Sequence, residues 1–405
     1  MGSDRPPLSD TRRKSQKWIH DYLVMTAGRP TLFDHEPRRY PSAVKSYAMV
    51  PKHMARAGRR KQQWAAEAEA HGHLETASEL YWAAIEDFHQ AQHAIHSDTP
   101  QKRLYYDRLL ACYDKVIELN PTAIEHVEVP WQDSSIPCIY HPVPGKPQAP
   151  AVLFAPGMDM IKEVFPEPAH NPFHRRGMHL MVMDGPGVGV SRLRGLLARP
   201  DNYELAASAV IDHLLTRPEV DSERLGVMGV SMGSYWGTRI AAHDRRVRAV
   251  ATVSACYGSK KPIFEQASPR FKWAFMYMAG IDDEAEFDRM AEEMTAIGLG
   301  PSIQCPALMV VSEYDQLSYL EDSLALFDEL GGPRELWLLE DESHSMAGLP
   351  HFAGNDARHS MIDWLRDVFQ SGLPPDHAKI VRMPRAGRGP YEPAARYPLD
   401  EEFAF

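Results

Sequence analysis

A serine between two glycines offers the clearest chemistry in this sequence. Ser231 lies in the run Gly229-Val230-Ser231-Met232-Gly233, which matches the G-x-S-x-G pattern. The pattern needs a strand before it and a helix after it, because a sharp turn must lift the hydroxyl clear of a sheet. An apolar run at 225–228 precedes the serine, and a helical stretch at 234–242 follows it. We therefore expect Ser231 to be a nucleophile; a glycine-rich turn without chemistry is the alternative.

A serine hydroxyl needs a base to take its proton, and the base needs an acid to orient it. Asp315 follows the apolar run at 307–311, and His344 follows the run at 335–339. The chain order is therefore serine, aspartate, histidine, the order found in α/β-hydrolases. We expect Ser231 to attack a carbonyl carbon, His344 to move the proton and Asp315 to orient the imidazole. Glu313, nearer the end of its run, is the competing acid.

Two N–H groups must stabilise the oxyanion that forms on the attacked carbonyl. We expect one to be the backbone N–H of Met232, directly after the nucleophile. The loop after the apolar run at 151–154 should supply the other, from the backbone N–H of Met158. Lys162 and Glu163 in the same loop are interpreted as a structural ion pair, with direct catalysis as the alternative.

The elements that must position these residues follow a strand-and-helix alternation from residue 124 onward. A hairpin is expected at 124–129 and 136–140, and further strands at 151–154, 179–183, 225–228, 247–253, 307–311 and 335–339, with a last helix at 360–369. Short apolar runs between helices are typical of a mainly parallel sheet covered on both faces. The expected fold class is thus α/β, with helices on both faces of the sheet.

The first part of the chain is expected to be all-helical. Helical patterns end at Asn120-Pro121, and beyond Gly372 the sequence is rich in Pro, Arg and Gly. We predict a helical N-terminal cap domain at 1–121, a catalytic domain at 122–371 and a Pro/Arg-rich tail at 372–405. Six aromatic residues of the helices are interpreted as core, with a substrate pocket as the alternative: Trp64, Tyr81, Trp82, Phe88, Tyr105 and Tyr106. Three histidines at near-helical spacing, His89, His93 and His96, are interpreted as a solvated helix face, with a metal site as the alternative.

Composition limits the partners and the compartment. The net charge is −11, so nucleic acid is an unexpected partner, and the basic cluster of Arg12, Arg13, Lys14 and Lys17 is interpreted as a solvated helix face. The four cysteines, Cys112, Cys138, Cys256 and Cys305, have no disulfide-like or metal-like spacing. No apolar run reaches the roughly 20 residues of a membrane span, and no secretory signal is visible. We expect a cytoplasmic protein acting on a small molecule, without metal or cofactor, and a homodimer is possible.

A glycine-rich run at 184–191 resembles a dinucleotide loop at first sight. Asp184-Gly185-Pro186-Gly187-Val188-Gly189-Val190-Ser191 has the spacing G-x-G-x-G instead of G-x-G-x-x-G, and Pro186 lacks an N–H for a phosphate. We interpret these glycines as sites of tight packing beside the active site, as in many α/β-hydrolases.

With these motifs, the chain resembles the α/β-hydrolase family of 2,6-dihydroxypseudooxynicotine hydrolase and the fungal polyketide-shortening (heptaketide) hydrolases. The resemblance covers roughly 15–370 and depends on the runs at 156–163, 184–191 and 229–233, with Asp315 and His344. It implies cleavage of a carbon–carbon bond in a β-dicarbonyl compound, beneath a helical roof. The same residues could hydrolyse an ester or thioester or transfer an acyl group, and a binding protein without hydrolysis is a third possibility. Glu265 is interpreted as a surface residue, with a pocket carboxylate as the alternative.

Overall fold

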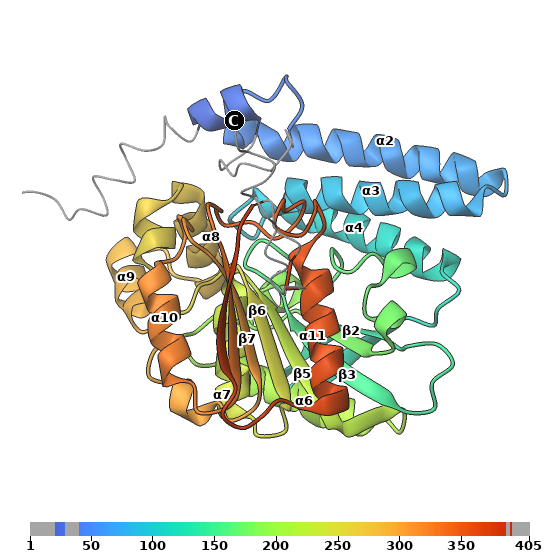
Figure 1. Ribbon diagram of the computed structural model, residues 1–405. Helices are drawn as coiled ribbons and strands as arrows, with labels where there is room; N and C mark the ends of the chain where they lie inside the picture. The colour runs from blue at the N-terminus through green and yellow to red at the C-terminus, as the bar shows by residue number, and fades with distance from the viewer. Residues whose placement is uncertain (1–20, 29–39, 386–388, 391–405) are drawn as a thin grey trace, which may run out of the picture.

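The computed structural model describes residues 21–28, 40–385 and 389–390. The basic cluster at Arg12–Lys17 and the end of the expected tail, 391–405, lie outside the described residues. Within the described ranges the chain forms a nine-stranded sheet with helices on both faces and a layer of long helices across one end (Figure 1). No helix in these ranges is long and apolar enough to cross a membrane.

The sheet is mainly parallel, as predicted. Its strand order is β1-β2-β4-β3-β5-β6-β7-β8-β9, in which the β1–β2 and β2–β4 pairs are antiparallel and the other pairs are parallel. The strands are β1 (Glu125–Trp131), β2 (Ser134–His141), β3 (Ala149–Ala155), β4 (His179–Met183), β5 (Val220–Val230), β6 (Ala249–Val253), β7 (Ala307–Ser312), β8 (Arg334–Leu339) and β9 (Ala378–Met383). Every residue of β4, β6 and β7 is buried, because helices cover both faces.

The helices divide into two side layers and an end layer. They include α5 (Gly189–Leu193), α6 (Tyr203–Leu215), α7 (Met232–His243), α8 (Pro269–Ala279), α9 (Glu284–Glu292), α10 (Leu320–Glu329) and α11 (Ala357–Ser371). Side chains of α6, α7 and α10 pack in the hydrophobic cluster on one face of the sheet, and those of α11 pack in the cluster on the other. The α/β-hydrolase fold is therefore confirmed.

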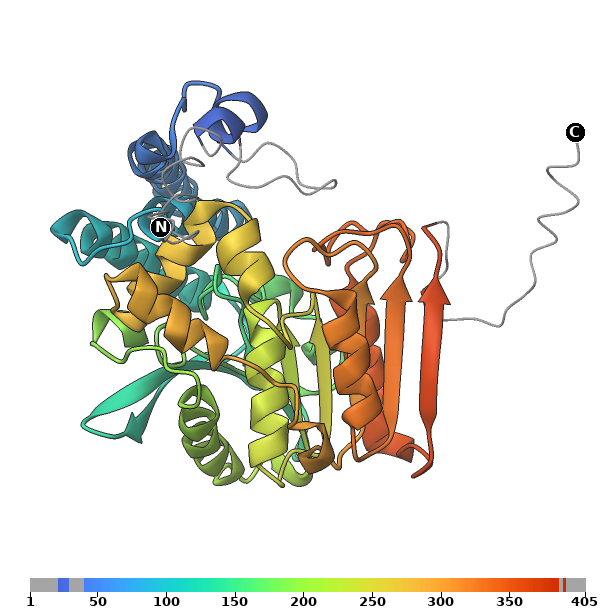
Figure 2. The same ribbon diagram turned by 90° about the vertical axis from the view of Figure 1, so that its left-hand side faces the viewer.

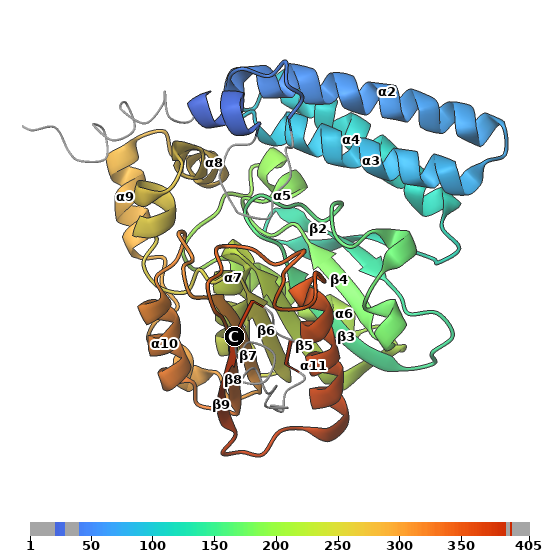
Figure 3. The same cartoon turned by 45° about the horizontal axis from the view of Figure 1, so that its top comes forward.

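Three long helices, which we call the helical region, lie across the end of the sheet (Figures 1 and 3). They are α2 (Val50–Ala70), α3 (Leu74–His93) and α4 (Pro100–Leu119). The side chain of Thr99 accepts a hydrogen bond from the N–H of Lys102, and Pro100 occupies the first turn, so the start of α4 is well specified. Tyr81, Phe88 and Tyr106 join the same hydrophobic cluster as the sheet residues, which supports their interpretation as core. The same interpretation is wrong for Trp64, which is 49% exposed.

The sheet extends beyond the boundary predicted at residue 371. Strand β9 pairs in parallel with β8, with Val381 opposite Trp337, and forms the edge seen in Figure 2. Only Val381 and Met383 of this strand are buried. Lys379 and Arg382 stand exposed on the edge, where charged side chains discourage pairing with another chain. A single short edge strand within a Pro- and Arg-rich stretch gives too weak a pattern to be recognised in sequence.

Candidate active site

The turn between β5 and α7 holds Ser231 in a strained conformation. Its φ is 56° and its ψ is −123°, a region that residues with a Cβ rarely adopt. A Cβ on Gly229 would collide with the carbonyl oxygen of Gly233, and one on Gly233 would collide with that of Ala155. The two glycines of the motif are therefore required by backbone packing, and together they allow the sharp turn that lifts the serine side chain off the sheet.

Ser231, His344 and Asp315 come together at the carboxyl ends of β5, β8 and β7. Nε2 of His344 lies 2.9 Å from Oγ of Ser231, and Nδ1 of His344 lies 2.7 Å from Oδ2 of Asp315. The side chains of His344 and Asp315 are 6% and 3% exposed, so water screens their contact little. Because an ionised carboxylate only accepts hydrogen bonds, Nδ1 carries the ring proton, and Nε2 is left to accept the proton of the serine.

The competing acid, Glu313, faces another way. Its Oε2 accepts a hydrogen bond of 2.9 Å from the backbone N–H of Asp341. Asp315, by contrast, is fixed toward the imidazole, because its second oxygen accepts from the N–H of Leu317 at 2.8 Å. The structure thus places Asp315, and not Glu313, against His344.

The loop after β3 lies directly against the serine. A Cβ built on Gly157 would lie 3.2 Å from Cβ of Ser231, so Met158 follows at the point of closest approach. Among the described residues, neither Met158 nor Met232 donates its N–H to another backbone carbonyl. The assignment of these two N–H groups to an oxyanion hole, which needs unpaired donors beside the nucleophile, stays a prediction.

Behind this loop, two acids and one base form a buried cluster. Nζ of Lys162 donates to Oε1 of Glu163 and, at 3.1 Å, to Oδ2 of Asp184. The N–H of Lys162 also donates to Oδ1 of Asp184 at 2.9 Å. Burial raises the pKa of Glu163 to about 7, against the opposing charge of Lys162. The structural ion pair predicted for Lys162 and Glu163 is present, with Asp184 as a third member.

The glycine-rich run at 184–191 packs as tightly as predicted. A Cβ on Gly185 would collide with the ring of Tyr203, one on Gly187 would lie 2.6 Å from Cβ of Ala198, and one on Gly189 would collide with the carboxylate of Asp184. That carboxylate accepts from the N–H of Val190 at 3.0 Å, so no open cradle for a phosphate is left there.

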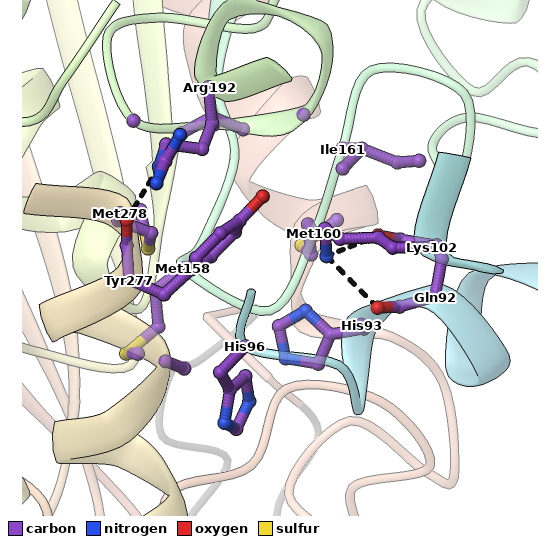
Figure 4. A pocket seen from close by; sticks show the side chains of 14 residues that line it. Gln92, His93, His96, Lys102, Met158, Met160, Ile161, Arg192, Tyr277 and Met278 are labelled. Carbon is purple, nitrogen blue, oxygen red and sulfur yellow. Dashed lines mark hydrogen bonds between the residues drawn. The ribbon is translucent and has the colours of Figure 1, made fainter. Parts of the chain in front are cut away.

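A small hollow of about 40 Å³ lies beside Met158, between the hydrolase fold and the helical region (Figure 4). Its labelled lining residues are Gln92, His93, His96, Lys102, Met158, Met160, Ile161, Arg192, Tyr277 and Met278. The methionines and the isoleucine give an apolar floor, while α3, α4, α5 and α8 supply a polar wall. The lining is therefore mixed, with apolar and polar side chains both facing the hollow.

Hydrogen bonds and an ion pair connect the polar side chains of the helical region with those of the hydrolase fold. The hydroxyl of Tyr277 donates to Asp98 at 2.7 Å, and Arg192 contacts Asp98 at 3.1 Å. Nζ of Lys102 donates to Oε1 of Gln92 and to the carbonyls of Gln92 and Ile95, and burial lowers its pKa to about 7. Sequence patterns gave no signal for these contacts, because the partners lie far apart along the chain.

The interpretation of the three histidines as a solvated helix face is wrong, and His96 lies beyond the end of α3 with its Nε2 buried. His89 is buried, and both His89 and His93 contact Asp159 of the loop beside Ser231. Among the described residues, no group of three or more His, Cys, Asp or Glu side chains could hold a metal ion. Glu265 is half-buried in the turn Pro262–Gln266 and is not among the residues that line the hollow.

Comparisons with known proteins identify the family of the chain. A family model described as esterase FrsA-like matches residues 54–282, more than half of the chain. The chain belongs to the FrsA-like esterase family. The model of the prolyl oligopeptidase family also matches the chain, over residues 207–372. The protein is a hydrolase by this relationship.

Named relatives confirm the resemblance seen in the sequence. The chain is 28% identical over 313 residues to the 2,6-dihydropseudooxynicotine hydrolase of Paenarthrobacter nicotinovorans, covering 74% of this chain and 79% of that one. It is 25% identical over 248 residues to the α/β hydrolase xenA of Xenoacremonium sinensis, covering 58% of this chain but only 57% of that relative. The crystal structure of a 2,6-dihydroxy-pseudo-oxynicotine hydrolase has the same fold, with a TM-score of 0.70 and 22% identity, covering 90% of this chain and 98% of that one.

Proposed function

We propose that this protein is a serine hydrolase that uses Ser231, His344 and Asp315 to cleave a carbon–carbon bond in a β-diketone-type or polyketide-like small molecule. The observation that carries the proposal is the continuous series of contacts from Ser231 Oγ through the imidazole of His344 to Asp315. The strained turn at Ser231 and the two N–H groups beside it support the same chemistry.

The proposed reaction begins at one ketone of a 1,3-diketone. Oγ of Ser231 adds to the carbonyl carbon as its proton passes to Nε2 of His344, and the N–H groups of Met158 and Met232 stabilise the resulting oxyanion. The carbon–carbon bond then breaks, the electron pair leaves as an enolate, and His344 returns the proton to carbon. Water activated by His344 releases the acyl group, so diketone and water give a carboxylic acid and a ketone.

The hollow beside Met158 is proposed as an outer part of the substrate site, since Met158 lines it whereas Ser231, Asp315 and His344 do not. Its methionine floor would contact an apolar part of the substrate, and its polar wall would contact carbonyl or hydroxyl groups. Carbon–carbon cleavage is proposed ahead of ester cleavage because of the family resemblance of the sequence motifs, and a 2,6-dihydropseudooxynicotine hydrolase is among the relatives. Metal and cofactor do not enter the proposed steps.

A comparison of turnover for two substrates separates this proposal from its alternative. We expect an acyl-phloroglucinol or a similar β-diketone to be cleaved, and p-nitrophenyl acetate to be turned over more slowly, when both are followed with the same enzyme preparation. Brisk turnover of the ester beside an inert diketone would contradict carbon–carbon cleavage and would favour the alternative.

That alternative is a carboxylesterase or thioesterase, or an acyl-transferring variant, using the same residues. Its support is the description of the matching family as an esterase. Labelling by a fluorophosphonate probe tests both versions at once, because it requires only an activated serine. A protein that is not labelled at Ser231 would be a binding protein on a hydrolase fold.

We also propose a cytoplasmic location and a homodimer. Cys112, Cys138 and Cys256 are buried and Cys305 is half-buried, and all four are free thiols, which suits a reducing compartment. Sedimentation velocity measures the oligomeric state directly, and a single monomeric boundary at micromolar concentration would contradict the dimer.

A further inference from the structure

Asp159, the residue after Met158, is held by contacts from two distant helices. Its carboxylate accepts from Nη1 of Arg270 at 3.1 Å and from Nη2 at 2.5 Å. Nε2 of His93 lies 3.1 Å from the same carboxylate, and Nε2 of His89 lies 2.8 Å from the backbone carbonyl of Asp159. Side chain and backbone of this one residue are therefore both fixed, by α8 on one side and by α3 on the other.

The Arg270 contact is an ion pair with little room to move. Arg270 is 5% exposed, and a buried guanidinium is strongly destabilised unless an anion accompanies it. Partial burial of Asp159, whose side chain is 37% exposed, opposes its ionisation, but the charge of Arg270 holds the pKa of this carboxyl well below its usual value. The two planar groups meet through two parallel hydrogen bonds, which fix orientation as well as distance.

The other end of the same loop is anchored independently. Lys162 binds Asp184 at the end of β4 through both its N–H and its Nζ. Glu163, which contacts Lys162, also lies 3.5 Å from the hydroxyl of Tyr106 in α4. The loop that carries Met158 therefore contacts residues of α3, α4 and α8 and the end of β4. Of these elements, α3 and α4 belong to the helical region.

An oxyanion donor needs such support, because its N–H must point at the position that the oxygen occupies in the transition state. The peptide that follows Met158 ends in the residue that His89, His93 and Arg270 hold. We propose that Asp159 is a positioning residue of the oxyanion hole, through which α3 and Arg270 fix the direction of the Met158 N–H. This inference rests on the proposed function, and it makes the helical region a support of the reaction as well as a roof.

Asp159→Asn tests the proposal, because it keeps the size of the side chain and removes its charge. We expect kcat to fall about 10- to 100-fold with KM little changed, a fraction of the effect of losing an oxyanion donor outright. Affinity for a trifluoromethyl ketone, which forms a tetrahedral adduct with the serine, should fall by a similar factor. A role limited to stability would leave both quantities unchanged in the folded protein.

The matched control breaks a similar ion pair elsewhere. Arg176 contacts Asp363 through two hydrogen bonds of 2.8 Å, on the α11 side of the sheet. Asp363→Asn should lower thermal stability while kcat and ketone affinity stay at the wild-type values. If Asp159→Asn does not fold, His93→Gln replaces it, because that variant keeps the Arg270 pair and should lower kcat in the same direction by a smaller factor.

The possible results distinguish a failure of the positioning role of Asp159 from a failure of the proposed serine-hydrolase function. Wild-type protein labelled at Ser231 by a fluorophosphonate, with an unchanged kcat in folded Asp159→Asn and His93→Gln, would overturn the positioning role alone. Wild-type protein that is not labelled would overturn the proposed function and the positioning role with it. A selective loss of kcat and of ketone affinity, absent in Asp363→Asn, supports the positioning role.

Discussion

At the residue scale, the candidate site depends on a strained backbone conformation at Ser231. Ser231 has a positive φ although it has a Cβ, and strained residues of this kind cost on the order of 1–3 kcal/mol each. The surrounding packing must supply that energy, here through the N–H of Ser231, which donates to the carbonyl of Val253 at 2.9 Å. The hydroxyl is thereby placed beside His344, where its proton can be removed.

Ser231→Ala should abolish activity and leave the fold intact. We expect kcat/KM to fall by about 10⁴- to 10⁶-fold, since only the oxyanion donors and substrate binding would remain. Hydrolysis assays and thermal unfolding measured together check this. Ser208→Ala is the control, because Ser208 binds Asp244 far from the site and should keep full activity. Retained turnover in Ser231→Ala would contradict the assignment of the nucleophile.

The choice between the two acids can be measured directly. Asp315→Asn should lower kcat by about 10⁴-fold, because an amide in place of the carboxylate favours the wrong tautomer of His344. Glu313→Gln should change kcat no more than a few-fold, since Glu313 contacts a backbone N–H instead. The reverse order of effects would reassign the acid.

At the scale of elements, the turn depends on how closely α7 approaches β3. Gly233 lies in the first turn of α7, and its Cα faces the carbonyl oxygen of Ala155 at the end of β3. Gly237, one turn later in the same helix, has ordinary distances around an added Cβ, the nearest being 3.4 Å to Val227. The two glycines of one helix therefore have different structural requirements.

Gly233→Ala should destabilise the protein by about 3 kcal/mol, because overpacking against backbone leaves little room for relaxation. Gly237→Ala should be neutral or stabilising by up to about 1 kcal/mol, since alanine favours helix over glycine. Free energies of unfolding from urea titrations decide the comparison. Equal effects of the two substitutions would show that the close approach to Ala155 is not the limiting contact.

At the scale of the whole molecule, buried histidines make stability depend on pH. Burial lowers the pKa of His89 to about 3 and that of His141 to about 3, far below the ordinary value near 6.5. Between about pH 3 and pH 6.5 the unfolded chain therefore binds more protons than the folded one. Stability contributed by the neutral rings is therefore present above pH 6.5 and is lost as the pH falls below it.

We expect the free energy of unfolding to fall between pH 7.5 and pH 5.5, with about 1.4 kcal/mol lost per histidine and pH unit below 6.5. His141→Phe should make this decline shallower, because both ring nitrogens of His141 are buried without a hydrogen-bond partner in the described structure. His73→Gln, at an exposed position, is the control and should keep the wild-type slope. A slope that is unchanged in His141→Phe would contradict the role of that ring.

The sequence by itself determined the order of the strands along the chain and the residues at their carboxyl ends. Apolar runs between helical segments predict a parallel sheet, and parallel strands bring residues such as Ser231, Asp315 and His344 to one edge. The need for glycine on both sides of Ser231 can likewise be predicted from the sequence, because a tight turn restricts side-chain size locally. The N-terminal helices follow from their periodicity in the same way.

Tertiary structure alone decided what the helices contact and which acid faces the imidazole. The contacts of Asp159 with His89, His93 and Arg270 join segments far apart in sequence, so no periodic pattern records them. Strand β9 is stabilised by pairing with β8, which compensates for a sequence with weak strand character. Local patterns report the period of an element, whereas the direction of a buried charged side chain depends on the partner that three-dimensional packing provides.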